Sequence, residues 1–496
     1  MRPRLLCALA FACAQAQRPP PAPSGYLELQ SGHYQLFTDL AEPAARAAIA
    51  RMENVRVALL EGSWKSEGPS PEKQLRVVEF RSLERLREFT NPGMSAFYQP
   101  VDLFGEPFLV LTAEETAAGD GVLKHELAHA QHGSFLPRSP RWFFEGLACY
   151  LETLRFDPTD GRYLLGEPSE ERLEYLRVHP EVDYARVLSM PARDAVLLGG
   201  QQGYEFQSAA WLLVFYLANE YRAQLDEYIA RLARREEAQA AFAAAFPGLD
   251  AAELAGQAAR YRASLTLGKE KVRLREVRVP SARVDALVRE VPAADVQAMR
   301  AQLFFLSPGL PRARAHLPQA RAAADQALQS DPSHPLALAV LLALPEGGPA
   351  PPPLERIRAA AAARPNDFRP QLLLAFAVGP DRPEERRAAL ARAAELAPEN
   401  STVLNALAWH DLTHGRAAEA VAVARKAASL APGRAAVLDT LATALAMSSR
   451  CAEAASVEER AVELSAEHAS GELRRRLLAR LDAMRAGCAA IPLDDE

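Results

Sequence analysis

Two histidines, His125 and His129, lie four residues apart in the chain, and Glu126 directly follows the first. Residues four apart lie on one face of an α-helix, so both imidazoles can reach a single metal ion. Glu126 lies one residue further round, where a carboxylate can act on water without binding the metal. Glu145, sixteen residues after His129, can supply a third ligand from a second helix. Three protein ligands with an open fourth position are the pattern of a catalytic zinc site.

The residues around Glu145 are typical of a buried helix. The run from Trp142 to Glu152 is aromatic and apolar except for its two glutamates, which are seven residues apart and so share one face. A carboxylate on a buried helix is costly unless it is paired or bound to a metal. Gly133 and Pro137 are expected to end the first helix and turn the chain toward the second. The alternative is that the His-Glu-x-x-His match is an ordinary polar helix face.

The pattern His125-Glu126-x-x-His129, followed by Trp-x-x-Glu-Gly-x-Ala-x-Tyr-x-Glu, resembles the gluzincin metallopeptidases, specifically the bacterial peptidase MA-like group related to the aminopeptidase N fold. The resemblance is tight over residues 121–152 and loose over 25–265. It implies an α+β zincin-like catalytic domain in which both histidines and Glu145 bind zinc and Glu126 is the general base. The chain lacks a Gly-x-Met-Glu-Asn motif and its connecting loop is shorter, so aminopeptidase specificity does not transfer.

Further residues border this motif. His132 is either a ligand or a histidine at the helix C-terminus, favoured there by the helix dipole and capped by Gly133. Glu152 is expected to accept the remaining N–H of a ligand imidazole, the alternative being a surface carboxylate. Cys149 is expected to be a small buried residue rather than a nucleophile. Gluzincins often use a downstream tyrosine to stabilise the oxyanion, and Tyr204 is either that donor or a tyrosine packed at a helix start.

Residues 1–16 resemble an export signal, with early arginines, a short apolar run and an Ala-x-Ala cleavage site. The alternative is a short, frayed helix. The residues around Cys13 match a lipoprotein site poorly. A soluble exported protein is therefore expected, and lipid anchoring is the alternative. Residues 17–24 are expected to form a proline-rich spacer. The sequence therefore predicts a periplasmic or secreted protein.

Composition limits the classes of function. At 496 residues the chain is too long for one core, so two or three domains are expected. The net charge of −6 and the lack of a basic run disfavour a nucleic-acid partner. The chain has no apolar stretch long enough for a transmembrane span. An oxidising compartment would permit a disulfide between Cys451 and Cys488, which the sequence alone does not establish.

The region before the motif is expected to be a small α+β module, with strands at 33–39, 75–80, 96–98 and 108–112 and helices at 42–61 and 83–90. In gluzincins the last strand before the metal helix is an edge that pairs with substrate. Phe108–Thr112 is therefore either that edge or an internal strand. A long helix at 204–221 and three shorter ones complete a peptidase domain over 25–265, followed by a charged linker over 266–290.

The C-terminal part contains a repeat. A Leu-Ala-Pro tripeptide recurs after thirty-four residues, and three prolines recur at thirty-three-residue spacing. A helix-turn-helix unit of this length is typical of tetratricopeptide repeats. The match is good over 401–466, weaker before 366 and interrupted at 349–353. We expect an all-α tetratricopeptide-repeat solenoid over 291–486 and a short tail over 487–496, the alternative being an alanine-rich bundle.

Two functions follow from these patterns. The first is an exported zinc metallopeptidase that hydrolyses peptide bonds with metal-activated water, while the repeats dock a substrate or protein partner. The second is a non-catalytic tetratricopeptide interaction scaffold whose metal site is vestigial or structural. Glu126 favours the enzyme, because a metal site without catalysis has no chemical need for a general base.

Overall fold

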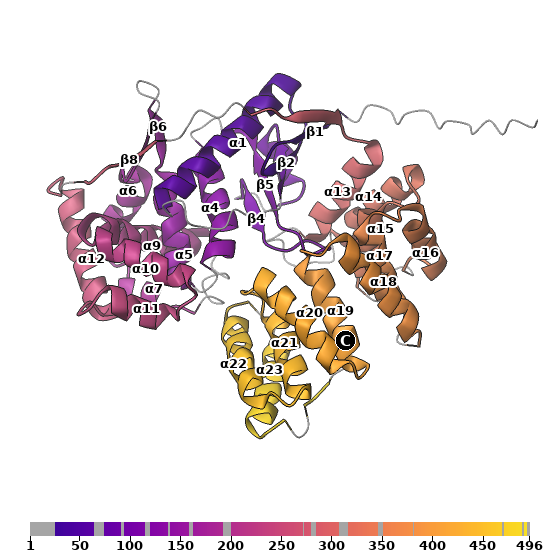
Figure 1. The fold of residues 1–496 in the computed structure, drawn as a ribbon. Coiled ribbons are helices and arrows are strands. Elements are labelled where there is room, and N and C mark those ends of the chain that lie inside the picture. The colour runs from indigo at the N-terminus through magenta and orange to yellow at the C-terminus, as the bar shows by residue number, and fades with distance from the viewer. Residues whose placement is uncertain are drawn as a thin grey trace, which may run out of the picture.

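The structure is a computed structural model that describes residues 25–63, 74–90, 94–114, 120–136, 139–157, 162–191, 200–270, 272–278, 284–306, 316–345, 351–379, 381–468, 471–488 and 491–493. The expected export signal and the spacer after it lie outside these residues. Figure 1 shows an α/β part and a large helical part, which is followed by a curved stack of helices. None of the described helices is long and apolar enough to span a membrane.

A six-stranded sheet lies at the centre, in the order β4-β5-β3-β2-β1-β9. Its strands are β1 (Leu27–Gln30), β2 (Tyr34–Thr38), β3 (Leu75–Phe80), β4 (Phe97–Gln99), β5 (Phe108–Thr112) and β9 (Leu287–Glu290). The strands β2, β3 and β5 are parallel, and β4, β1 and β9 pair antiparallel with their neighbours. β5 is therefore an internal strand, and the edge on its side of the sheet is β4. All five β5 residues are buried because neighbours cover both faces.

Side chains alternate between the two faces of the sheet, and each face packs on a different set of helices. Leu36, Val77 and Leu109 face the core shared with α1 (Glu42–Ser63) and α4 (Gly121–Phe135). Val78 and Phe108 face the opposite way, toward α2 (Leu83–Arg87) and α13 (Ala293–Leu306). α13 is the first helix of the region that we expected to be a separate repeat domain.

A helical lobe follows α4. It consists of α5 (Arg141–Glu152), α6 (Glu170–Val178), α7 (Tyr184–Ser189), α9 (Gly200–Glu220), α10 (Arg222–Ala233), α11 (Ala238–Ala245) and α12 (Ala251–Thr266). α5 and α9 pack closely at Gly146, where an added Cβ would lie 2.3 Å from the carbonyl oxygen of Ala210. The glycine after Glu145 is thus explained by helix packing.

The stretch expected to be a linker, 266–290, contains two strands. β8 (Arg275–Arg278) joins a small sheet with β6 (Arg155–Asp157) and β7 (Arg162–Leu165), and β9 joins the central sheet. The stretch expected to be a charged linker thus contributes one strand to each sheet. Charged residues concealed these strands, because their exposed positions carry arginine and glutamate while Val277 is buried.

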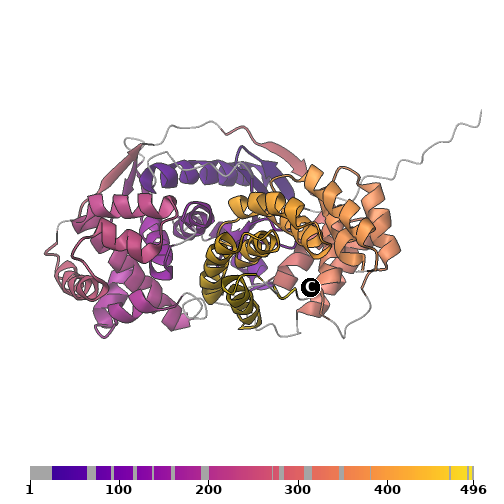
Figure 2. The same cartoon turned by 60° about the horizontal axis from the view of Figure 1, so that its bottom comes forward.

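The C-terminal region is an all-α stack of helical hairpins. After α13 it contains α14 (Leu317–Ser330), α15 (Pro335–Ala343), α16 (Leu354–Ala363), α17 (Phe368–Ala377), α18 (Pro383–Leu396), α19 (Ser401–Thr413), α20 (Ala417–Leu430), α21 (Ala435–Met447), α22 (Cys451–His468) and α23 (Gly471–Arg485). The helices α15, α17, α19 and α21 begin 33, 33 and 34 residues apart, so the repeat continues through the proline-rich interruption. The stack bends, and its last helices lie below the sheet (Figures 1 and 2).

The two halves of the molecule meet at the turn between β4 and β5. Phe104 in this turn is fully buried among repeat residues, with its ring 6.2 Å from that of Phe368. The side-chain amide of Asn400 donates to the Phe104 carbonyl at 2.9 Å. Gly105 has φ +81°, and a Cβ there would lie 2.0 Å from the Thr402 hydroxyl. The turn before β5 therefore shares a core with the repeats.

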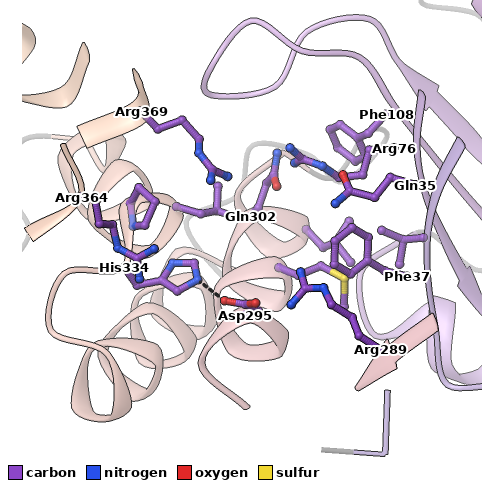
Figure 3. Close-up of a pocket in the computed structure, with 15 residues that line it drawn as sticks. Gln35, Phe37, Arg76, Phe108, Arg289, Asp295, Gln302, His334, Arg364 and Arg369 are labelled. Atoms are coloured by element: carbon purple, nitrogen blue, oxygen red, sulfur yellow. Dashed lines mark hydrogen bonds and ion pairs between the residues drawn. The ribbon is translucent and has the colours of Figure 1, made fainter. Parts of the chain in front are cut away.

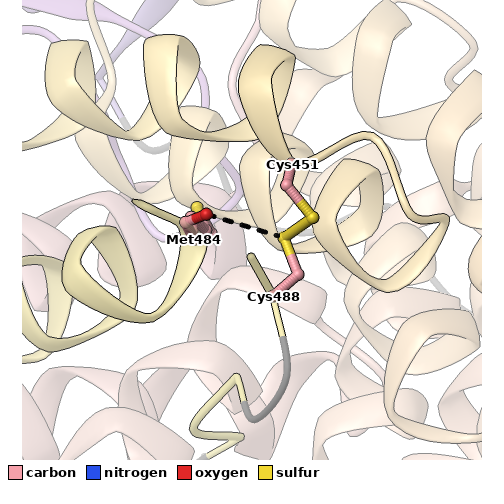
Figure 4. The surroundings of a disulfide bond; sticks show 3 residues. All are labelled: Cys451, Met484 and Cys488. Atoms are coloured by element: carbon pink, nitrogen blue, oxygen red, sulfur yellow. Dashed lines mark hydrogen bonds between the residues drawn. A yellow bond between two sulfur atoms is a disulfide. The ribbon is translucent and has the colours of Figure 1, made fainter. Parts of the chain in front are cut away.

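Cys451, at the start of α22, forms a disulfide with Cys488, just beyond the end of α23 (Figure 4). Their Cα atoms are 5.8 Å apart. The bond links the start of α22 to the chain just after α23, within the last described hairpin of the stack. Cys149 forms no disulfide and is buried, as expected, and its Sγ lies 4.0 Å from Nδ1 of His125.

Candidate metal centre

The helices α4 and α5 bring His125, His129 and Glu145 together in the core of the helical lobe. Each of these side chains belongs to a residue that is less than a tenth exposed. The two Nε2 atoms lie 2.9 Å apart. One Glu145 oxygen lies 3.6 Å from Nε2 of His125, and the other lies 3.5 Å from Nε2 of His129. Buried polar groups that converge in this way need a common partner.

These separations fit a single zinc ion. Nitrogen and oxygen ligands bind zinc at about 2.0–2.2 Å, so tetrahedral ligand atoms lie about 3.3 Å from one another. The observed separations of 2.9, 3.5 and 3.6 Å bracket this value. Two imidazoles and one carboxylate are also a donor set that zinc prefers at sites with an open position. Among the described residues, the three therefore suit a metal site.

His125 is also held from behind. Its Nδ1 lies 2.6 Å from Oε1 of Glu152, and both Glu152 oxygens accept hydrogen bonds of 2.8 Å from Nη2 of Arg172 on α6. The contact between Glu152 and an imidazole is the one that the seven-residue spacing predicted. A carboxylate at Nδ1 holds the proton there and leaves Nε2 as the lone-pair donor.

Without a metal ion, the site favours a protonated His125 beside an ionised Glu152, so zinc would displace a proton from Nε2. Burial lowers the pKa of His125, but contacts with Cys149 and Glu152 outweigh it and hold that pKa well above its usual value. Burial raises the pKa of Glu152, but His125 and Arg172 outweigh it and lower that pKa. Glu152 therefore stays negatively charged at Nδ1 of His125, and this charge makes the imidazole a stronger ligand.

Two residues that the sequence reasoning missed hold Glu145. Arg141 forms an ion pair of 2.6 Å with Oε1, and the Gln207 amide donates to Oε2 at 3.2 Å. Burial raises the pKa of Glu145, but the charges of His129 and Arg141 outweigh it and hold the pKa well below its usual value. Arg141 lies four residues before Glu145, so helix spacing could have identified it. Gln207 comes from α9, and no local pattern marks it.

His132 differs from the expectation of a capped helix end. α4 continues past Gly133 to Phe135, so the helix does not end at the glycine. His132 is fully buried, and burial together with His129 and His125 holds its pKa well below its usual value. A neutral imidazole gains nothing from the helix dipole. Its ring packs 5.5 Å from that of Phe144, which also stacks on His129.

The two expected catalytic residues lie at different depths. Glu126 is half-buried on α4, next to His125. Tyr204 lies one turn inside α9, which begins at Gly200 rather than at Tyr204 itself. Its ring is 5.5 Å from the guanidinium of Arg172. Tyr204 therefore lies next to the Arg172–Glu152 pair that contacts Nδ1 of His125. Its hydroxyl is buried, and the Glu171 carboxylate lies close to it. The oxyanion role of Tyr204 remains a prediction.

Comparisons with known proteins found similar solved structures but no related sequence. No protein-family model and no curated protein matches the chain. One similar solved structure is a thermophilic TPR protein from Thermus thermophilus, with 18% identity over 39% of this chain and 99% of that chain and a TM-score of 0.29. Another is the MamA protein, with 17% identity over 35% of this chain and 92% of that chain and a TM-score of 0.26. Scores this low carry no argument about function.

Proposed function

We propose that the chain is a zinc metallopeptidase of the gluzincin type, whose helical repeats dock a protein substrate or partner. The observation that carries the proposal is the buried triangle of His125, His129 and Glu145, with Glu152 behind the first histidine. This donor set, together with Glu126 on the same helix, supports hydrolysis rather than a structural metal site, which would have four protein ligands.

The roles of the residues follow from their positions. His125, His129 and Glu145 would hold the zinc ion, which when bound supplies a Lewis acid that polarises the scissile carbonyl and acidifies water. Glu126 accepts the proton of the attacking water and delivers it to the leaving amine. Arg141 keeps Glu145 charged and fixed in orientation.

We propose β4 as the strand that pairs with an extended substrate. It is an edge strand, and it lies against α4, the helix that carries the two histidines. A peptide added to such an edge gains main-chain hydrogen bonds, and its alternate side chains face the site. Of the two alternatives for Phe108–Thr112, the internal strand is the one found, and β4 is the edge beside it.

The proposal is tested by separating zinc binding from turnover. Glu126→Gln should retain zinc and lose about 10²–10⁴-fold in activity, because the amide cannot accept a proton. Glu145→Ala should instead lower the zinc content, because it removes a ligand. Glu170→Gln, the same change at an exposed position on α6, is the control and should affect neither. The measurements are elemental analysis and cleavage of a peptide library.

A second candidate function is a non-catalytic scaffold. The observation that favours it is the stack of helical hairpins, because such stacks bind partners through extended surfaces. A purified chain that holds zinc but cleaves no peptide in the library would favour the scaffold. Near-native turnover in Glu126→Gln would contradict the peptidase mechanism.

We also propose that the chain is exported. The disulfide between Cys451 and Cys488 supports this, because disulfides persist in oxidising compartments. Mass spectrometry of the mature N-terminus should find it at Gln17, after the expected cleavage site. A cytosolic chain that begins at Met1 and has reduced cysteines would contradict export.

A further inference from the structure

A cavity of about 330 Å³ lies between the central sheet and the first repeats (Figure 3). On the sheet side it is bounded by β2, β3, β5 and β9, and on the other side by α13, α15 and α17. Its sheet residues Val78 and Phe108 face α13, whereas Val77 and Leu109 face the core that contains α4. The cavity is therefore on the opposite face of the sheet from the candidate metal centre.

Four arginines line this cavity: Arg76, Arg289, Arg364 and Arg369. Figure 3 shows them reaching in from the sheet and from the repeats. Among the described residues of the lining, Asp295 is the one carboxylate, and it lies 2.9 Å from Nε2 of the buried His334. Four guanidinium groups and one carboxylate therefore border the cavity, and the carboxylates that pair with the arginines lie outside its lining.

Carboxylates outside the lining hold these arginines in place. Arg369 donates through Nε and Nη2 to Asp367, both at 2.9 Å, and Arg76 donates to Asp102 at 3.2 Å. Arg364 pairs with Asp331, and Arg289 pairs with the buried Glu28. A guanidinium carries five N–H donors, so each fork keeps donors beyond those used by its partner. The arginines are thus fixed in position before a ligand binds, which lowers the cost of binding.

Two helix N-termini border the cavity, capped by the side chains of His334 and Asp367. α15 begins at Pro335 and α17 begins beside Arg369, and both ends contribute residues to the cavity. The N-terminus of a helix carries a partial positive charge that favours anions. The rest of the lining is apolar and includes Phe37, Met299 and Leu336. An inorganic anion would leave this apolar surface uncovered.

From these observations we propose that the cavity is a second ligand site, which binds a carboxylate attached to a small apolar body. Arginine forks recognise carboxylates with paired hydrogen bonds, and the apolar side chains cover the body of the ligand. The volume is at the small end of the usual range for ligand sites, about 300–1,000 Å³. Two sources share this chemistry: the C-terminal residues of a peptide and a short fatty acid.

The site can be reached from solvent and connects the two halves of the molecule. The side chains of Arg364 and Arg369 are each 35% exposed, so a ligand can enter beside them. A bound carboxylate would contact arginines of the sheet and of the repeats together. Binding here does not depend on peptidase activity, so the two proposals can fail independently.

The test uses the full chain carrying Glu126→Gln, so that no peptide is cleaved. Calorimetry measures the binding of acetyl-leucyl-phenylalanine, of its C-terminal amide and of octanoate. We expect at least one acid to bind and the amide to bind about tenfold or more weakly, because it lacks the charge. Binding of only the peptide acid assigns the site to peptide C-termini, and binding of only octanoate assigns it to fatty acids.

Substitutions then place the binding in this cavity. Arg364→Gln with Arg369→Gln should weaken binding of the acid about tenfold or more, and the corresponding double lysine variant should retain part of the affinity. The control is Arg425→Gln with Arg485→Gln, two exposed arginines that pair with Glu453 and Glu459 far from the cavity. Melting curves without ligand check that each variant is folded.

Three outcomes would overturn the proposal. The first is the absence of measurable binding by either acid at millimolar concentration. The second is that the amide binds as tightly as the acid. This outcome is measured without any substitution in the cavity. The third is unchanged affinity in the folded double glutamine variant.

Discussion

At the scale of single residues, the negative charge of Glu152 next to His125 prepares the imidazole to bind a metal ion. Glu152 contacts Nδ1 at 2.6 Å and is itself held by Arg172. The carboxylate fixes both the tautomer and the orientation of the ring, so that Nε2 faces His129 and Glu145. A loss of this charge would weaken the ligand without removing it.

We therefore expect Glu152→Gln to weaken zinc binding about 10–100-fold while activity in saturating zinc is largely kept. Glutamine preserves the volume of the side chain but not its charge. Competition with a chelator of known affinity measures the change. Glu167→Gln, which removes an exposed carboxylate paired with Arg155, is the control. An unchanged zinc affinity would show that Glu152 has no part in holding the metal.

The hydroxyl of Tyr204 gives a second prediction. It is buried and lies close to the Glu171 carboxylate, which it would leave in order to donate to an oxyanion. Tyr204→Phe should lower turnover about 10²–10³-fold while zinc content and melting temperature stay the same. Tyr175→Phe, in the ring that packs 5.0 Å away, is the matched control. Unchanged turnover in Tyr204→Phe would leave Tyr204 as a packing residue.

The residues that could be predicted are those related by helix spacing. His125 with His129, and Glu145 with Glu152, each lie on one helix, where separations of four and seven fix a common face. Arg172 and Gln207 contact the same groups from α6 and α9. Their positions depend on how separate helices pack, and no local pattern carries that information.

At the scale of elements, the last hairpins of the repeat contain a buried acidic pair. Glu458 on α22 is fully buried near Asp439 on α21, and Arg480 on α23 forms an ion pair with Asp439 at 2.5 Å. Burial, with the charge of Asp439 adding to it, raises the pKa of Glu458 to about 9. The folded protein therefore keeps a proton on Glu458 at neutral pH, which the unfolded chain releases.

This proton makes stability depend on pH. Between the usual glutamate value of about 4.5 and the folded value of about 9, the folded state binds more protons than the unfolded state. The free energy of unfolding should therefore fall as pH rises through this window, by up to about 1.4 kcal/mol per pH unit. Stability from this group is fully present below the window and lost at its upper end.

Glu458→Gln should flatten this dependence, because the amide does not titrate. Thermal unfolding of the full chain between pH 5 and 9 measures it. Glu459→Gln, at the exposed neighbouring position, should leave the slope as it is in the unaltered chain. A slope in Glu458→Gln equal to that of the unaltered chain would assign the dependence to other groups.

Elements were predicted best where one face is apolar, as in β3, β5 and the repeat helices. The strands β8 and β9 were missed because they pair at the margins of their sheets and carry arginine and glutamate. The position of β5 was left open, because the strand that covers its edge, β4, is only three residues long. Strand order depends on pairing between distant segments, which periodicity does not encode.

At the scale of the whole molecule, the sheet and the repeats share a core. Met299 and Leu303 of α13 cover one face of the sheet, and Phe104 of the β4–β5 turn is buried among the repeats. That turn directly follows β4, the proposed substrate edge. The repeats therefore support the strand beside the candidate metal centre as well as offering a surface to partners.

The final prediction follows from this shared core. Phe104→Ala should destabilise the full chain by about 3–5 kcal/mol, because it leaves a cavity where the ring is fully buried. Phe376→Ala on α17 is the matched control, since that ring is 49% exposed and its loss opens no cavity. A chain that ends at residue 290 should be insoluble or poor in zinc, because the sheet face under α13 would be open to water. Urea unfolding and elemental analysis measure these effects. A soluble, zinc-loaded truncated chain, together with equal stability of the two alanine variants, would show that the sheet and the repeats fold independently.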